Sequence, residues 1–324
     1  MSKAIRFHKL GGPEVLVYED VPVGDPGPGQ ARIRHTAIGV NFIDTYQRTG
    51  LYALPLPCVA GNEGAGVVEA VGPGVTTVKP GDRVAYTGQP PGSYSEQRLY
   101  AADRLVKLPQ GISDEQAASI MLKGMTAQYL IHSTYAVKPG DTVLFHAAAG
   151  GVGLLACQWL KAIGATVIGT VGSDEKAALA RAHGCTHTIV YTRENFVERV
   201  KEITGGKGVP VVYDSVGKTT WEGSLDCLRP RGLMVSFGNS SGPVAPFALT
   251  VLAQKGSLYV TRPTLFTYIA ARADLESISA SLFDAVVSGK VKVEISGRYK
   301  LADAAQAHRD LEGRKTTGCL VLLP

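Results

Sequence analysis

Apolar and polar residues follow two different spacings along this chain. In the first third, short segments such as 4–7, 15–18 and 31–37 alternate apolar and polar side chains, and clusters of Gly and Pro separate them. A period of two is typical of strands that bury one face. We therefore expect residues 3–108 to form a mostly β domain of the barrel type.

From residue 142 onward, short apolar runs alternate with segments that repeat their apolar residues at helical spacing. This order predicts a doubly wound parallel sheet with helices on both faces, an α/β fold. The expected strands are 143–145, 167–170, 188–191, 209–214, 232–237 and one near 257–260, and the expected helices are 153–163, 174–183, 194–203 and 221–227.

Helical signals also occur between and after these two regions. Residues 113–116, Ser-Asp-Glu-Gln, form a capping box, which predicts a helix at 115–122, and a second helix is expected at 126–135. The last segment is expected to return to the first domain with helices near 275–288 and 301–311 and a strand at 319–323. The predicted domains are 1–122, 123–263 and 264–324, the last being the C-terminal part of the first.

A glycine-rich turn follows the first strand of the predicted parallel sheet. The sequence from Ala148 to Gly153 is Ala-x-Gly-x-x-Gly. It differs from the Gly-x-Gly-x-x-Gly pattern of dinucleotide-binding turns only by Ala148 in place of the first glycine. Glycines let the backbone approach a pyrophosphate, and the free N–H groups of the following helix attract it. An ordinary strand-to-helix turn is the alternative interpretation of this pattern alone.

The next strand ends without the acidic residue that an NAD-specific site places about 20 residues after the turn. Residues 169–173 carry no carboxylate, and Asp174 is the first one. Ser173 is the expected N-cap of the following helix, and Lys176 lies in its first turn. A hydroxyl and an ammonium group suit a 2′-phosphate and hence NADPH, although Lys176 could also be a solvated helix lysine.

Composition limits the classes of protein that remain. A chain of 324 residues with 45% hydrophobic residues is long and apolar enough for two globular domains. The net charge of +5 is spread thinly, which gives no support for nucleic acid as the main partner. No segment resembles a signal peptide or a membrane span, and the five scattered cysteines are typical of a reduced, cytoplasmic protein. We expect no catalytic cysteine.

Five motifs together resemble those of the medium-chain dehydrogenase/reductase superfamily, and within it the zinc-free NADPH:quinone oxidoreductases, the group that includes zeta-crystallin. The resemblance spans the whole chain and implies a GroES-like β-barrel catalytic domain, a Rossmann NADPH-binding domain and a homodimer paired near residues 256–260. The motifs are Gly-Val-Asn-Phe-Ile-Asp at 39–44, Gly-Asn-Glu-Gly-Ala-Gly at 61–66, His-Ala-Ala-Ala-Gly-Gly-Val-Gly at 146–153, Phe-Gly-Asn-Ser-Ser at 237–241 and Val-Thr-Arg-Pro at 260–263.

The chain departs from the zinc-dependent members of this superfamily at their metal ligands. Those enzymes carry a cysteine where this chain has Asn41, a histidine where it has Asn62, and a four-cysteine lobe where residues 88–104 contain none. Zinc requires thiolate, imidazole or carboxylate ligands, so we expect no metal. An acceptor that takes a hydride without a Lewis acid, such as a quinone, then fits best. Glu63 is interpreted as a buried, hydrogen-bonded carboxylate.

The resemblance also implies the site residues. Asn41 and Tyr46 would be the catalytic residues and line the acceptor and nicotinamide cleft, with Tyr52 near its mouth. Tyr46 is expected to donate a hydrogen bond to the developing quinone oxygen, the alternative being a packing role. His146 is interpreted as structural. The implied cofactor-binding residues are Lys123, Thr126, Gly150, Gly151, Val152, Ser173, Lys176, Tyr191, Phe237, Gly238, Asn239, Val260, Thr261, Arg262 and Arg314.

Two other functions stay open at this stage. An NADPH-dependent alkenal or enone reductase would share the fold and the glycine turn. A zeta-crystallin-like nucleotide- or RNA-binding protein would differ in class, and its RNA binding would be salt-sensitive.

Overall fold

The first structural unit combines both ends of the chain. It comprises residues 1–125, 269–287 and 293–324, and the second unit comprises residues 126–268 and 288–292. The computed structural model describes all 324 residues. No helix is long and apolar enough to cross a membrane.

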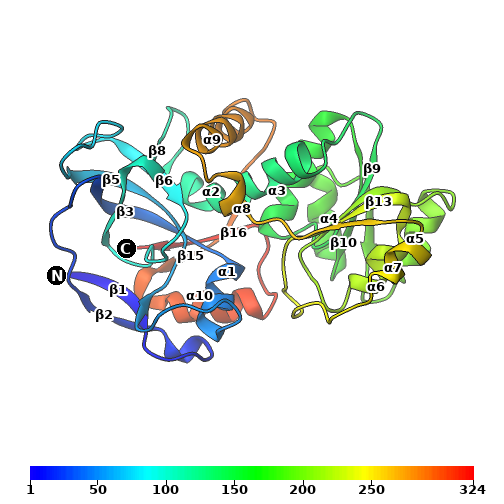
Figure 1. The fold of residues 1–324 in the computed structure, drawn as a ribbon, viewed down its shortest axis with the longest axis horizontal. Coiled ribbons are helices and arrows are strands. Elements are labelled where there is room, and N and C mark those ends of the chain that lie inside the picture. Colours follow the sequence, from blue (N-terminus) through cyan, green and yellow to red (C-terminus); the bar gives the residue numbers. More distant parts are fainter. The chain divides into compact units, whose positions relative to one another are not determined.

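Two sheets form the first unit, as the alternating pattern predicted (Figure 1). A seven-stranded sheet has the order β15-β16-β3-β5-β6-β8 with β7 paired to β3, and a three-stranded sheet has the order β2-β1-β4. Because β16 pairs antiparallel with β3, the last strand of the chain is joined to its N-terminal part. The strands are β1 (Ser2–Phe7), β2 (Val17–Val21), β3 (Gln30–Val40), β4 (Cys58–Val59), β5 (Glu63–Val71), β6 (Arg83–Thr87), β7 (Gln97–Ala101), β8 (Val106–Lys107), β15 (Ile295–Lys300) and β16 (Cys319–Leu323).

The helix after the capping box is continuous, so the prediction of separate helices at 115–122 and 126–135 was wrong. The box itself is confirmed: the Gln116 N–H donates to Ser113 Oγ at 3.2 Å, and the Ser113 N–H donates to Gln116 Oε1 at 3.0 Å. Helix α2 runs through Gly124, and this glycine allows close packing, because a Cβ there would lie 2.6 Å from Leu282 Cδ1 of α9. The helices are α1 (Phe42–Thr49), α2 (Asp114–Tyr129) with a π-helical turn at Leu130–Thr134, α9 (Arg272–Val287) and α10 (Ala304–Glu312).

The second unit is a six-stranded sheet with the order β11-β10-β9-β12-β13-β14, in which every pair is parallel. This confirms the doubly wound sheet, and Figure 1 shows helices flanking it. The strands are β9 (Thr142–Phe145), β10 (Thr166–Val171), β11 (His187–Val190), β12 (Val209–Asp214), β13 (Leu228–Ser236) and β14 (Tyr259–Thr261). The helices are α3 (Gly151–Ile163), α4 (Asp174–Ala182), α5 (Phe196–Ile203), α6 (Trp221–Asp226), α7 (Thr250–Gln254) and α8 (Leu265–Tyr268).

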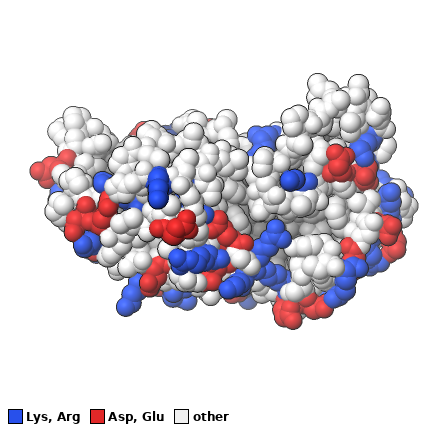
Figure 2. All heavy atoms as spheres, turned by 90° about the horizontal axis from the view of Figure 1, so that it is seen from below, with Lys and Arg blue, Asp and Glu red and all other residues white.

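One face of the molecule carries charges of both signs (Figure 2), and the cysteines form no disulfide. Basic and acidic side chains are interspersed over the face shown in Figure 2. All five cysteines are free, and four of them are buried. Burial raises the pKa of the Cys227 thiol to about 12 and that of Cys319 to about 11, which keeps both protonated and unreactive.

Candidate active site

The glycine turn between β9 and α3 has the geometry of a phosphate-binding loop. A Cβ on Gly153 would lie 2.4 Å from Ala147 O and 2.7 Å from Ala148 O, so only glycine fits there. No side chain caps the start of α3 at Gly150. The N–H groups of the first turn and the positive end of the helix are therefore suited to a pyrophosphate.

His146 fixes the base of this turn and has a structural role, as expected. The buried ring places Nδ1 2.9 Å from Thr170 Oγ1 and Nε2 3.0 Å from Ser224 Oγ. Ser224 in turn donates to Asp214 Oδ2 at 2.9 Å. The network joins the carboxyl ends of β9, β10 and β12, where dinucleotides bind in open parallel sheets.

Ser173 and Tyr191 follow the carboxyl ends of β10 and β11, and Lys176 lies in the first turn of α4. Ser173 caps α4, because its Oγ accepts the Lys176 N–H at 3.3 Å. Tyr191 is 44% exposed, and a Cβ on Gly172 would lie 2.9 Å from its hydroxyl oxygen. The group offers hydroxyl and ammonium donors at a helix N-terminus, which suits a 2′-phosphate.

The remaining predicted cofactor residues of the second unit follow β13 and β14. The Phe237 N–H donates to Asp214 O at 2.8 Å, and a Cβ on Gly238 would lie 2.5 Å from Ser215 O. Arg262 Nη1 donates to Ser236 O at 3.0 Å. Asn239 lies in the loop after β13, and Val260 and Thr261 lie in β14. Thr126 lies in α2 and is buried. In the first unit, Arg314 follows α10 with a φ of 56°.

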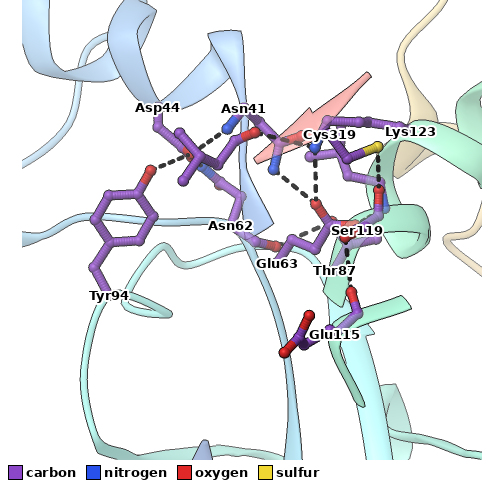
Figure 3. A network of polar contacts seen from close by, with 12 residues as sticks. Asn41, Asp44, Asn62, Glu63, Thr87, Tyr94, Glu115, Ser119, Lys123 and Cys319 are labelled. Atoms are coloured by element: carbon purple, nitrogen blue, oxygen red, sulfur yellow. Dashed lines mark hydrogen bonds and ion pairs between the residues drawn. The ribbon is translucent and has the colours of Figure 1, made fainter. Parts of the chain in front are cut away.

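Asn41, Glu63 and Lys123 form a buried cluster in the first unit (Figure 3). Asn41 Nδ2 donates to Glu63 Oε2 at 2.8 Å, and the Leu122 N–H donates to Glu63 Oε1 at 2.6 Å. Lys123 Nζ lies 3.6 Å from Glu63 Oε2 and donates to Val40 O at 3.0 Å. Burial raises the pKa of Glu63, and the Lys123 ammonium opposes this rise. The expected buried, hydrogen-bonded role of Glu63 is confirmed.

The Asn41 side chain has one unused acceptor. Asn41 precedes α1, and its backbone N–H donates to Asp44 Oδ2 at 2.8 Å. Its side-chain Oδ1 is buried without a hydrogen-bond partner. An unpaired buried acceptor costs about 1–3 kcal/mol, so a ligand that donates a hydrogen bond here would satisfy it.

The residues in the zinc positions of related enzymes do not fit a metal. Asn41 directs its Nδ2 at Glu63, and Asn62 directs its Nδ2 at Asp44 Oδ1 and Gln47 Oε1, at 2.6 and 2.7 Å. An amide nitrogen that donates in this way is not a zinc ligand. No group of three or more His, Cys, Asp or Glu side chains is placed to hold a metal ion.

A row of aromatic rings lines one side of α1. The Phe42 and Tyr46 rings are 6.2 Å apart, and the Tyr46 and Tyr52 rings meet edge to face at 5.5 Å. Sequence reasoning identified both tyrosines but missed Phe42. Phe42 could have been identified from its spacing of four residues from Tyr46, because this spacing places the two rings on one face of a helix. These rings offer an apolar surface for a flat ligand.

Two family models match the chain, and together with the fold they define a medium-chain dehydrogenase/reductase. Residues 27–137 match the alcohol dehydrogenase GroES-like domain, and residues 151–276 match the zinc-binding dehydrogenase domain. Within this superfamily, the chain belongs to the quinone oxidoreductases. It is 58% identical over 325 residues to the quinone oxidoreductase of Pseudomonas aeruginosa, with 100% of both chains covered.

Two further comparisons refine this relationship. The solved structure of Escherichia coli quinone oxidoreductase complexed with NADPH matches with a TM-score of 0.98 and 53% identity, covering 99% of this chain and 100% of that one. The 2-haloacrylate reductase of a Burkholderia species is 52% identical, covering 100% of this chain and 99% of that protein. The GroES-like and Rossmann folds implied by the resemblance are therefore confirmed.

Proposed function

We propose that this protein reduces quinones with NADPH and without a metal ion. The observation that carries the proposal is the end-to-end likeness to quinone oxidoreductases, one of them solved with NADPH. The glycine turn before α3 and the donors around Ser173 fit the two phosphate-bearing parts of that cofactor. The amide side chains at Asn41 and Asn62 favour an acceptor that needs no Lewis acid.

The reduced nicotinamide supplies the hydride when the cofactor is bound, and the quinone also takes up a proton to become a hydroquinone. The Tyr46 hydroxyl donates a hydrogen bond to the quinone oxygen as negative charge develops there. Asn41 Oδ1 accepts a hydrogen bond from a bound ligand and so gains the partner it lacks. Phe42, Tyr46 and Tyr52 provide the apolar surface on which the quinone ring packs and from which water is excluded.

We assign the cofactor-binding residues to successive parts of NADPH. Residues 1–122 and 264–324 form the catalytic domain, and residues 123–263 bind the nucleotide. Lys123 and Thr126 serve the nicotinamide ribose, and Gly150, Gly151 and Val152 serve the pyrophosphate. The 2′-phosphate is bound by Ser173, Lys176 and Tyr191, and the nicotinamide end by Phe237, Gly238, Asn239, Val260, Thr261, Arg262 and Arg314.

A second candidate function has a specific observation in its favour. The likeness to a 2-haloacrylate reductase supports reduction of an activated C=C bond by the same cofactor. That reaction also needs a hydride and a proton, and it makes the same demands on the glycine turn. It differs in the acceptor, which is small and not aromatic and gains less from the rings of α1.

The protein is further proposed to be a cytoplasmic homodimer. Strand β14 is an edge of the six-stranded sheet, and Tyr259 in it is 62% exposed. Pairing of two β14 strands would continue the sheet across the dimer and cover such side chains. The five free cysteines favour a reducing compartment.

A paired assay tests the proposed reaction. Consumption of NADPH and of NADH is followed with benzoquinone, with a naphthoquinone and with a 2-alkenal, each with and without a chelator. NADPH-selective turnover of quinones that is indifferent to chelator supports the proposal. Turnover of the alkenal alone would replace it with the C=C reductase, and NADPH binding without turnover would leave a binding protein.

A further inference from the structure

Two exposed charges at the proposed 2′-phosphate site form a pair that no motif identified. Arg193 Nη1 donates to Asp174 Oδ2 at 2.6 Å, and Arg193 Nη2 donates to Asp174 Oδ1 at 2.5 Å. The contact is bidentate, although both side chains are more than half exposed. Two parallel hydrogen bonds between a guanidinium and a carboxylate fix the relative orientation of the two side chains more closely than a single ion pair does.

The backbone holds both residues at this site. Asp174 is the first residue of α4 and follows the cap Ser173. Arg193 lies two residues after Tyr191, and its N–H donates to Val190 O at 3.0 Å. Between them, Thr192 Oγ1 donates to Gly172 O at 3.4 Å, which joins the loop after β11 to the loop after β10.

The Asp174 carboxylate is poorly matched to the ligand expected here. A 2′-phosphate carries negative charge, and a carboxylate beside it repels the phosphate. A carboxylate would instead favour the 2′-hydroxyl of NADH, as in NAD-specific sites. Arg193 removes this conflict, because it cancels the charge of Asp174 and occupies both of its oxygens.

We infer that Arg193 neutralises Asp174 and thereby sets the preference for NADPH over NADH, an inference that rests on the proposed function. Arg193 is here a specificity-determining residue that acts through the charge of Asp174. It is distinct from Ser173, Lys176 and Tyr191, which are assigned to direct contact with the phosphate.

The net charge of the pair predicts how wild type and three variants rank in their preference for NADPH over NADH. Wild type and the double variant Asp174→Asn/Arg193→Ala have a net charge of zero at this pair. Arg193→Ala leaves one negative charge, and Asp174→Asn leaves one positive charge. The preference for the 2′-phosphate should therefore be highest in Asp174→Asn, equal in wild type and the double variant, and lowest in Arg193→Ala.

Equilibrium binding tests this order without relying on turnover. Titration calorimetry measures the Kd of NADP⁺ and NAD⁺, and of adenosine 2′,5′-bisphosphate and 5′-AMP, for all four proteins. The selectivity ratio is expected to fall about tenfold in Arg193→Ala, because one uncompensated charge near a phosphate at a solvated surface has this order of effect. The differences should shrink at high salt. Arg229→Ala is the matched control and should keep the wild-type ratio, because this exposed arginine lies on β13, away from β10 and β11 in the sheet.

The double variant separates charge neutralisation from direct contact. Recovery of the wild-type ratio in Asp174→Asn/Arg193→Ala supports the inference. A double variant as unselective as Arg193→Ala would overturn it, because Arg193 would then bind the phosphate itself. A preference for NADP⁺ that survives in Arg193→Ala also overturns it, while the proposed cofactor stands. A wild type that binds NAD⁺ as tightly as NADP⁺ overturns both.

Discussion

Arg48 Nη1 lies 2.9 Å from Nδ1 of His308, although 260 residues separate them along the chain. A guanidinium can only donate, so Nδ1 is an acceptor and the ring is neutral with its proton on Nε2. Nε2 lies 3.0 Å from the hydroxyl oxygen of Tyr94, which donates to Asp44 Oδ2 at 3.0 Å. The contact therefore anchors α1, which carries Tyr46, to the C-terminal helix α10.

Loss of the Arg48 side chain should destabilise the protein strongly. Arg48 is 1% exposed and also donates to Gly11 O and to Glu312 Oε1. Arg48→Met would leave the buried Nδ1 of His308 without its donor and would also remove the contacts to Gly11 O and Glu312 Oε1. The free energy of unfolding should therefore fall by about 2–4 kcal/mol in urea titrations. The control Arg309→Met removes an exposed arginine of α10, and its change should stay within about 0.5 kcal/mol. Equal small changes in both variants would contradict the argument.

Acid should destabilise the fold through two buried histidines. Burial lowers the pKa of His308 and of His35 to about 3, and Arg48 and Arg98 add to this. The unfolded state therefore binds more protons than the folded state between the ordinary value of 6.5 and about 3, and stability is lost as pH falls through that window. Asp44 acts in the opposite direction, because burial raises its pKa to about 6, so the folded state binds the extra proton there.

The variant His35→Gln isolates one of these contributions. The free energy of unfolding should decline less steeply with falling pH than in wild type, since one proton-linked group has been removed. Urea titrations over a series of pH values measure this slope. An unchanged slope would show that His35 does not titrate with unfolding.

Local signals were enough to predict much of this fold. The alternating segments, the separate strands and helices of the second unit and the Ser113 capping box each depend on residues that are neighbours in the sequence. The glycine turn could also be predicted from the sequence. A Cβ at Gly153 would clash with atoms of its own turn, so the need for glycine is local. These features are set by short-range sterics and hydrogen bonds, which a sequence displays directly.

Helix α1 escaped prediction because its buried face is polar. Its buried residues are Asp44, Thr45, Gln47 and Arg48, whereas an ordinary surface helix buries an apolar stripe. Partners from distant segments, Asn62 and His308 among them, make this burial possible. The Asp174–Arg193 pair was missed for a similar reason, since no periodicity links two residues from different loops. Contacts between residues that are distant in the sequence can be identified only from the folded structure.

Substitution of Gly153 should weaken the binding of NADPH. A Cβ in Gly153→Ala would push against Ala147 O and Ala148 O and displace the turn that is assigned to the pyrophosphate. We expect the Kd for NADPH to rise by at least about 100-fold, since phosphate recognition here depends on backbone N–H groups. Fluorescence titration of NADPH measures this. Gly27→Ala is the control for substitution of a glycine, because Gly27 has an ordinary φ and a Cβ there meets only the flexible Gln30 side chain, at 3.2 Å from its Oε1.

Tyr46→Phe tests whether the hydroxyl takes part in the reaction. The change keeps the ring that packs against Phe42 and Tyr52 and removes only the donor. We expect kcat for quinones to fall about 10- to 100-fold, because a hydrogen bond to developing negative charge is strongest in the transition state. The Kd for NADPH should not change. Tyr52→Phe is the matched control and should retain most of kcat, since Tyr52 is assigned to packing. A normal kcat in Tyr46→Phe, with only a raised KM for quinone, would reduce Tyr46 to the same packing role.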